Sequence, residues 1–189
     1  MTTSTTTSGV TTDSIPWLDD REQHAWRAFI AMHAQLQVRL QQEMKREHDL
    51  SGADYSVLVG VSEAPCGRIR AHELGAGLQW EKSRLSKQIT RMEERGLLER
   101  QQCPTDARGS FVALTDLGRA AIERAAPFHV RQVRAHFIDV LSHEQLDQLD
   151  AIATAILGHL DGGACGAGQP SSDPGPAVGC ADDDLDGDR

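Results

Sequence analysis

The chain is short of the residues that mark membrane proteins and secreted disulfide-rich proteins. Its four cysteines are too few and too scattered for a disulfide scaffold. No apolar run approaches the roughly 18 residues that are needed to span a bilayer. The first ten residues, MTTSTTTSGV, lack the basic and apolar regions of a secretory signal. We therefore expect a soluble cytoplasmic protein that has no membrane partner.

The sequence also lacks the motifs that are diagnostic of enzymes. It contains no P-loop, no dinucleotide-binding glycine fingerprint, no G-x-S-x-G elbow and no H-E-x-x-H motif. The segment GAGLQW has two glycines and leads into a helical pattern, so we do not expect it to bind phosphate. His129, His136 and His143 have no cysteine or carboxylate at ligand spacing. We expect no catalytic activity, no cofactor and no metal.

Positive charge is scarce overall but concentrated in one segment. The formal net charge is −9, and residues 161–189 alone contribute −6 of it. Residues 68–108 carry nine basic and six acidic side chains, a local net charge of +3. A basic strip on an acidic protein is typical of nucleic-acid binding. A solvated surface of mixed charge is the alternative interpretation.

Composition divides the chain into one domain and two tails. Residues 1–14 are rich in Thr and Ser, and residues 161–189 are rich in Gly, Pro and Asp. Segments with so little to bury are expected to be disordered. The acidic tail either keeps the protein soluble or mimics a polyanion. Residues 15–160 are left as the folded domain.

A helical period dominates this domain. Apolar residues recur every three or four positions over about 17–48 and predict a long amphipathic helix. The segment ADYSVLVGVSEA predicts a second helix that ends before Pro65. A stripe from Leu117 to Val140 predicts another, which Pro127 should kink or disrupt. The last helix follows Ser142, where SHEQ has the pattern of a capping box.

The middle of the domain has a different pattern. GRIRAHELGAGL predicts a short extended piece and a short helix, and residues 81–95 predict a helix with Leu85, Ile89 and Met92 facing inward. Gly96 is placed to end that helix in the left-handed conformation. LLERQQ and SFVALT then flank CPTDARG, which is typical of a β-hairpin.

The predicted fold is therefore mainly α with a small β-hairpin wing. A winged helix-turn-helix part, residues 51–114, is flanked by long N- and C-terminal helices at 17–48 and 115–160. These helices exceed what so small a module needs to cover its core, so their surplus apolar faces predict a homodimer.

The outer side of helix 81–95 suits the major groove of double-stranded DNA. The expected DNA-binding residues are Lys82, Ser83, Arg84, Ser86, Lys87, Gln88, Thr90 and Arg91. Arginine and lysine bind guanine or phosphate, glutamine pairs with adenine, and hydroxyls allow close approach to the backbone. An ordinary solvated surface helix is the alternative.

The CPTDARG turn adds a candidate contact to the minor groove. Arg108 is expected at the hairpin tip, from which a guanidinium can enter a narrow minor groove. Asp106 is expected to hold the shape of the wing, and Gly109 relaxes the backbone constraint there. A D-x-R-G turn by itself is weak evidence for a DNA-binding wing, but here it follows two short helices in the order helix, helix, hairpin, which makes the evidence strong.

The run HELGAGL…SRLSKQITRMEERGLLERQQCPTDARGSFVALTDLGRAAIERA resembles the MarR family of bacterial winged-helix transcriptional regulators. So does LSHEQLDQLDAIATAILGHL, and the resemblance covers about residues 20–160. It implies a homodimeric repressor of a pseudo-palindromic operator, with half-sites roughly 10 bp apart. It also implies that 81–95 is the recognition helix and Arg108 the wing-tip arginine, with Asp106 its structural partner. The chain departs from the family at Cys103, where Asp often precedes Pro, and at Arg70, where Ser or Thr usually caps the helix.

The resemblance further implies that a signal relieves repression. Family members respond to small aromatic acids, oxidants or metals, and a crevice between the winged domain and the dimer helices is the expected pocket. Its aromatic candidates are Trp17, Trp26, Tyr55 and Trp80, and for each of them taken singly ordinary packing is the favoured interpretation. Redox sensing through Cys66, before a strand, or Cys103, at the wing base, is one alternative. A protein-interaction module that has lost DNA binding is the other.

Overall fold

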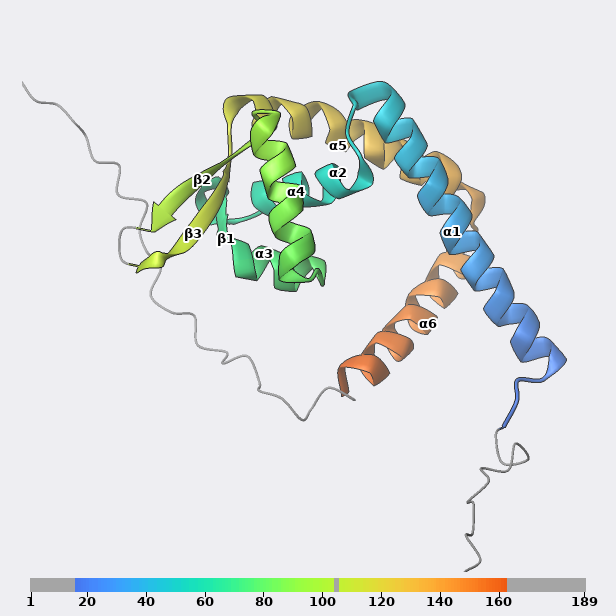
Figure 1. The fold of residues 1–189 in the computed structure, drawn as a ribbon. Helices are drawn as coiled ribbons and strands as arrows, with labels where there is room; N and C mark the ends of the chain where they lie inside the picture. The colour runs from blue at the N-terminus through green and yellow to red at the C-terminus, as the bar shows by residue number, and fades with distance from the viewer. Residues whose placement is uncertain (1–15, 104–105, 163–189) are drawn as a thin grey trace, which may run out of the picture. The chain divides into compact units, whose positions relative to one another are not determined.

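The computed structural model describes residues 16–103 and 106–162 (Figure 1). The predicted tails, 1–14 and nearly all of 161–189, lie outside these residues. The chain divides into two compact units between Arg39 and Leu40, within the first helix.

The first unit is the N-terminal part of helix α1 (Asp20–His48). A reciprocal cap fixes its start: the Asp19 N–H donates to Glu22 at 2.9 Å, and the Glu22 N–H donates to Asp19 at 2.8 Å. The helix therefore begins three residues later than the apolar period predicts. Trp26, Phe29 and His33 stack along one side of it, with ring centroids 6.0 and 6.3 Å apart. Trp26 and Phe29 remain exposed.

The second unit contains the remaining elements in the predicted order. After the end of α1 come α2 (Gly52–Ser62), β1 (Arg68–Arg70), α3 (Ala71–Leu78), α4 (Lys82–Glu94), β2 (Leu98–Cys103), β3 (Asp106–Leu114), α5 (Asp116–His136) and α6 (His143–Gly162). Short 3-10 turns lie at Pro65–Gly67 and Ile138–Val140. The strands form an antiparallel sheet in the order β1-β3-β2. This architecture confirms the predicted mainly helical fold with a winged helix-turn-helix.

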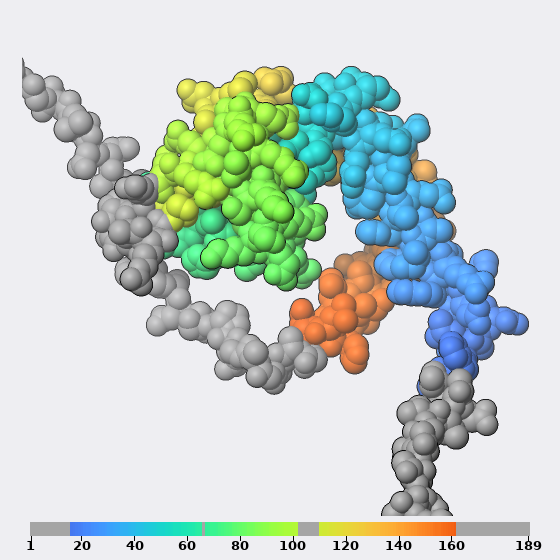
Figure 2. Space-filling model, in the orientation of Figure 1, coloured from blue at the N-terminus to red at the C-terminus, as the bar shows by residue number. Residues whose placement is uncertain are grey.

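The core of this unit joins α2, α4 and the sheet. Val57, Leu58, Ile89 and Val112 are almost completely buried, and each such side chain contributes about 1.5–3 kcal/mol. The predicted inward face of α4 is confirmed, because Leu85, Ile89 and Met92 are all buried. In the space-filling view α3, α4 and the strands form one continuous surface (Figure 2).

The hairpin differs from its prediction in where the strands end. Cys103 pairs with Asp106, so β3 begins at Asp106. The preceding pair is Gln102 with Ser110, which leaves residues 107–109 of β3 in an irregular stretch that includes Arg108. Cys103 therefore ends β2 at the turn, and its expected position at the wing base is wrong. The sequence pattern marked the turn but not the register.

Pro127 does not interrupt α5, so the expected local disruption is wrong. A proline removes the donor for the carbonyl four residues earlier, here Glu123. Both residues are exposed, so water can satisfy that carbonyl. The predicted cap of α6 is confirmed: the Ser142 N–H donates to Gln145 at 2.8 Å, and the Gln145 N–H donates to Ser142 Oγ at 3.2 Å.

Candidate nucleic-acid interface

Helix α4 presents a basic, polar face to solvent. The exposed members of the predicted set are Lys82, Ser83, Arg84, Ser86, Lys87, Thr90 and Arg91. Thr90 Oγ1 donates to the Ser86 carbonyl at 3.1 Å, which turns this hydroxyl back onto the helix. The face thus keeps the donors that major-groove recognition needs on one side of a single helix.

Gln88 is the exception, and its expected place on the outer flank is wrong. It is 7% exposed, and its Nε2 donates to Asp54 Oδ1 at 2.6 Å. Its position carried a signal for burial, because Leu85, Gln88, Ile89 and Met92 follow the i, i+3, i+4, i+7 spacing of one helix face. Because glutamine is polar, Gln88 is expected on the exposed side of the helix despite this spacing.

Asp54 of α2 anchors α4 from the inside. Besides the Gln88 amide it accepts the Ser51 N–H at 2.8 Å and Arg95 Nη1 at 2.8 Å. Arg95 follows α4, and its Nη2 donates to the Asp49 carbonyl at 2.7 Å. The middle of α4 is therefore bonded to the first turn of α2, and the residue after its C-terminal end is bonded to both α2 and the segment between α1 and α2. Sequence reasoning missed this network because its partners lie far apart in the chain.

The electrostatics of this network keep Asp54 ionised. Burial raises the pKa of its carboxyl group, but the hydrogen bonds from Ser51 and the Arg95 guanidinium outweigh burial, so its pKa lies below the usual range. Asp49, whose carboxylate lies 3.8 Å from Arg95 Nη2, also forms an exposed pair with Lys45, and this pair lowers the pKa of Asp49. Asp54 therefore remains a charged carboxylate on the buried side of α4.

The turn that leads into α4 is fixed by its backbone. Gln79 ends α3 in the left-handed conformation, with φ of 53°, and the Trp80 N–H donates to the Gly75 carbonyl at 2.9 Å. The Arg84 guanidinium carbon lies 4.1 Å from the centre of the Trp80 ring. At the start of α3, Arg70 occupies the cap position as expected, and its N–H donates to Glu73 at 3.3 Å.

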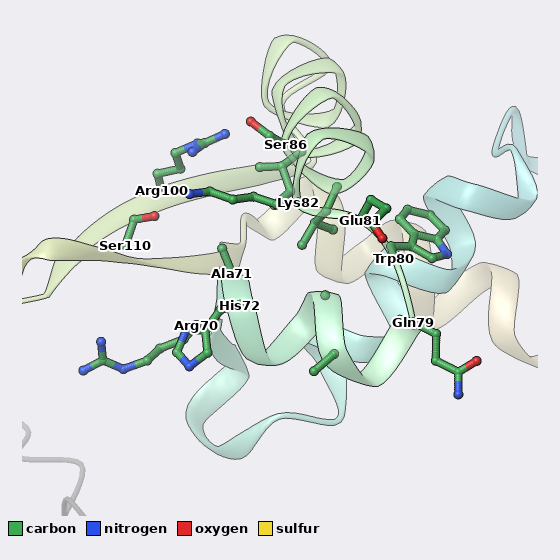
Figure 3. A pocket seen from close by; sticks show the side chains of 14 residues that line it. Arg70, Ala71, His72, Gln79, Trp80, Glu81, Lys82, Ser86, Arg100 and Ser110 are labelled. Atoms are coloured by element: carbon green, nitrogen blue, oxygen red, sulfur yellow. The ribbon is translucent and has the colours of Figure 1, made fainter. Parts of the chain in front are cut away.

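A hollow of about 580 Å³ lies between α3, α4 and the sheet (Figure 3). Its residues from α4 include Lys82, Leu85, Ser86 and Ile89, and Arg100 of β2 lines the opposite side. In the close view Lys82 reaches from α4 toward the strands. The hollow therefore shares side chains with the exposed face of α4.

The predicted aromatic set is divided by the structure. Trp80 lines the hollow, whereas Tyr55 packs against His129 with ring centroids 4.6 Å apart. Burial lowers the pKa of His129 and raises the pKa of Tyr55. Trp17 and Trp26 belong to the first unit and are exposed. The hollow lies within the winged part, rather than in the crevice expected from the family.

The wing residues are placed by their backbone alone. Asp106, Arg108 and Gly109 belong to the first part of β3, and their side chains lie outside the described part of the molecule. The same holds for the side chain of Cys103 and for that of Cys66, which lies in the turn at Pro65–Gly67.

Two kinds of feature are absent from the described ranges, 16–103 and 106–162. No helix there is long and apolar enough to cross a membrane. Within the same ranges, no three His, Cys, Asp or Glu side chains gather as a metal site would require. His136 instead lies 3.2 Å from Glu43.

Comparison with known proteins places these features in one family. A sequence model of the MarR family matches residues 48–109. AbsC, a MarR family transcriptional regulator from Streptomyces coelicolor, is 40% identical, with a TM-score of 0.74 over 78% of this chain and 99% of that one. Sco3205, a MarR family regulator from the same organism solved in complex with DNA, is 34% identical, with a TM-score of 0.73 over 85% and 96%. An uncharacterised HTH-type transcriptional regulator from Bacillus cereus is 28% identical over 65% of this chain and 80% of its own.

Proposed function

The chain belongs to the MarR family of DNA-binding transcriptional regulators, and from that premise we propose that it is a cytoplasmic homodimeric repressor that reads a pseudo-palindromic operator and releases it when a small molecule binds. The observation that best supports DNA binding is the exposed basic face of α4. The hydrogen bonds from Gln88 and Arg95 to Asp54 keep α4 in position from its buried side. In helix-turn-helix proteins the second helix enters the major groove, and its N-terminal residues contact base edges. Arg108, which belongs to the Asp106–Leu114 strand, is the residue that we propose for the minor groove.

The proposed DNA-binding part is residues 51–114, and within it we assign base or phosphate contacts to the seven residues of the predicted set that are exposed on α4 and to Arg108. Gln88 is left out of this set because Asp54 already binds its amide. An acidic protein gains affinity for DNA only where cations gather locally, since counterion release from phosphates drives non-specific binding. Carboxylates elsewhere on the chain then favour one orientation on the duplex.

A selection of duplexes by the purified protein tests DNA reading. We expect a palindromic consensus whose half-sites are one helical turn apart, and an affinity that falls steeply with salt. Arg108→Ala should weaken binding to the consensus duplex by about 1–3 kcal/mol, the range for one groove contact. Arg124→Ala, which removes an exposed arginine of α5, is the matched control. A flat salt dependence would favour the protein-interaction alternative.

The homodimer is proposed from apolar side chains that the single chain leaves in solvent. On α6 these are Ile152, Ile156, Leu157 and Leu160, which are 55–62% exposed. On α1 they include Trp26 and Phe29. Exposed apolar surface of this kind on a helix marks an interface, and a second copy of the chain, which carries the same helices, is the proposed partner.

Sedimentation equilibrium tests the dimer. Ile156→Asp should shift the mass toward the 20.6 kDa of one chain, because it places a charge inside the proposed interface. Ala151→Asp adds the same charge on the side of α6 away from these apolar residues and should leave the dimer intact. A wild-type protein that sediments as a monomer at micromolar concentration would contradict this part of the proposal.

The hollow beside α4 is the proposed effector site. Its volume of about 580 Å³ lies in the range of small-molecule sites, about 300–1,000 Å³. Leu85 and Ile89 supply an apolar wall, and Lys82 supplies positive charge. Arg100, whose Nε pairs with Glu93 at 3.0 Å, supplies the remaining donors of its guanidinium. A small aromatic acid fits this chemistry, and it would compete with DNA for Lys82.

A panel of aromatic carboxylates tests the effector. A ligand should raise the Tm of the protein and release a bound duplex in a gel shift, and Arg100→Gln should weaken both effects together. Release without any rise in Tm, or a rise in Tm that Arg100→Gln leaves unchanged, would place the effector elsewhere.

A further inference from the structure

Arg84 differs from the other cationic side chains on the exposed face of α4 because an aromatic ring holds it. Its guanidinium carbon lies 4.1 Å from the centre of the Trp80 ring. Within the described residues, Lys82, Lys87 and Arg91 have neither an ion pair nor a ring contact. One cation of the face is therefore fixed in position before DNA arrives, while three can move to meet phosphates.

The platform under Arg84 is itself rigid. Trp80 stands in the turn between α3 and α4, where its N–H is bonded to Gly75 and the preceding Gln79 adopts the left-handed conformation. Trp80 is partly buried against the hydrophobic core, and it lines the same hollow as Leu85. A ring fixed by backbone and core limits the rotamers of the side chain stacked on it.

Stacking leaves the hydrogen-bonding capacity of Arg84 intact. The guanidinium donors lie in the plane of the group, and a contact between its central carbon and an aromatic ring uses none of them. No carboxylate pairs with Arg84 among the residues that the structure describes. The group therefore presents its planar fork to solvent, in the geometry that binds guanine O6 and N7 together.

The position of Arg84 places this fork where bases are read. It is the third residue of α4, in the first turn, and N-terminal residues of a recognition helix are those that approach base edges. We infer that Arg84 reads a guanine in each half-site and that Trp80 is its positioning residue. Lys82, Lys87 and Arg91 then serve as phosphate contacts. This inference rests on the proposed function, since it names how the same face recognises sequence.

Arg84→Lys is the sharpest test, because it keeps the charge and removes the planar fork. In a duplex selection, the variant should lose its preference at one base pair in each half-site. Its affinity for the wild-type consensus should fall by about 5- to 150-fold, and its affinity for a random duplex should change little. Lys87→Ala is the matched control on the same face: it should weaken both duplexes alike and reduce the salt dependence by about one ion.

A double-mutant cycle tests the role of Trp80. Trp80→Leu should weaken consensus binding by about 2- to 5-fold in the wild-type background and not at all in the Arg84→Ala background. Trp80→Phe keeps a ring and should retain most of the affinity. If the loss from Trp80→Leu is merely a packing defect, it will appear equally in both backgrounds, which overturns the positioning role.

The outcomes separate this inference from the proposed function. If the wild-type protein selects no sequence, DNA reading itself is refuted. If it selects a consensus and Arg84→Lys selects the same one at every position, the proposed function stands and the assignment of Arg84 is refuted.

Discussion

Replacement of Asp54 by asparagine removes one negative charge from the interior and leaves the shape of the side chain. Asp54 is 5% exposed and accepts hydrogen bonds from Ser51, Gln88 and Arg95. The asparagine side chain keeps one acceptor oxygen, but its NH2 group would face donors of Ser51, Gln88 or Arg95 and could not accept their hydrogen bonds. We therefore expect the helix that carries the basic face to lose its support from α2.

The size of the effect follows from the contacts. A hydrogen bond to a charged group contributes about 1.5–3 kcal/mol. The Arg95 side chain is 37% exposed, so its share falls toward that of a surface pair, about 1 kcal/mol or less. With one acceptor retained, we expect Asp54→Asn to lower the free energy of unfolding by about 2–4 kcal/mol, a large part of the 5–15 kcal/mol typical of a domain.

Urea unfolding of both proteins, followed by circular dichroism at a series of pH values, measures this difference in the free energy of unfolding. The pKa of Asp54 is lower in the folded protein than in the unfolded chain, so ionisation of Asp54 stabilises the fold. This contribution is complete above the ordinary pKa of about 3.9, and it is lost as the pH falls through the lower pKa of the folded state. The difference between wild type and Asp54→Asn should thus be constant from pH 5 to 7 and shrink below about pH 4.

Asp49→Asn is the control, since Asp49 is exposed, pairs with the same arginine, and has a φ of 53° that asparagine adopts readily. It should leave stability close to that of wild type. An Asp54→Asn protein as stable as Asp49→Asn at pH 7 would refute the argument that this carboxylate anchors α4.

Two further predictions concern packing and titration. Gly118→Ala should destabilise the protein by more than about 3 kcal/mol in a thermal or urea melt, because its Cβ would lie 1.9 Å from the Leu97 carbonyl oxygen. The Cβ of Gly77→Ala meets nothing within 4 Å, so this variant should be neutral or gain up to about 1 kcal/mol in helix propensity. Equal stability of the two variants would contradict the close contact between α5 and Leu97. Burial lowers the pKa of His129, so the unfolded chain takes up its proton first and wild type should lose stability as the pH falls below about 6.5. His129→Gln should flatten that part of the stability profile, and an unchanged slope would show that His129 does not cause it.

The sequence by itself determined the elements and their order. Helical period located the long helices and the inward face of α4, and the capping pattern at Ser142 located the start of α6. Turn chemistry located the end of α4 at Gly96, whose φ is 69°. These features are decided by contacts within a few residues, so a single sequence contains the information. The resemblance to a known family then named the DNA-binding helix.

The tertiary structure decided which side chains work together. Gln88 and Arg95 meet Asp54 across 34 and 41 residues of sequence, and no local pattern specifies such a pairing. Strand register placed Cys103 at the turn, and solvent around Pro127 let α5 continue. The stacking of Arg84 on Trp80 needs a turn of fixed geometry between two helices. Local preference chooses a conformation residue by residue, whereas these contacts form only when separate elements pack and exclude water between them.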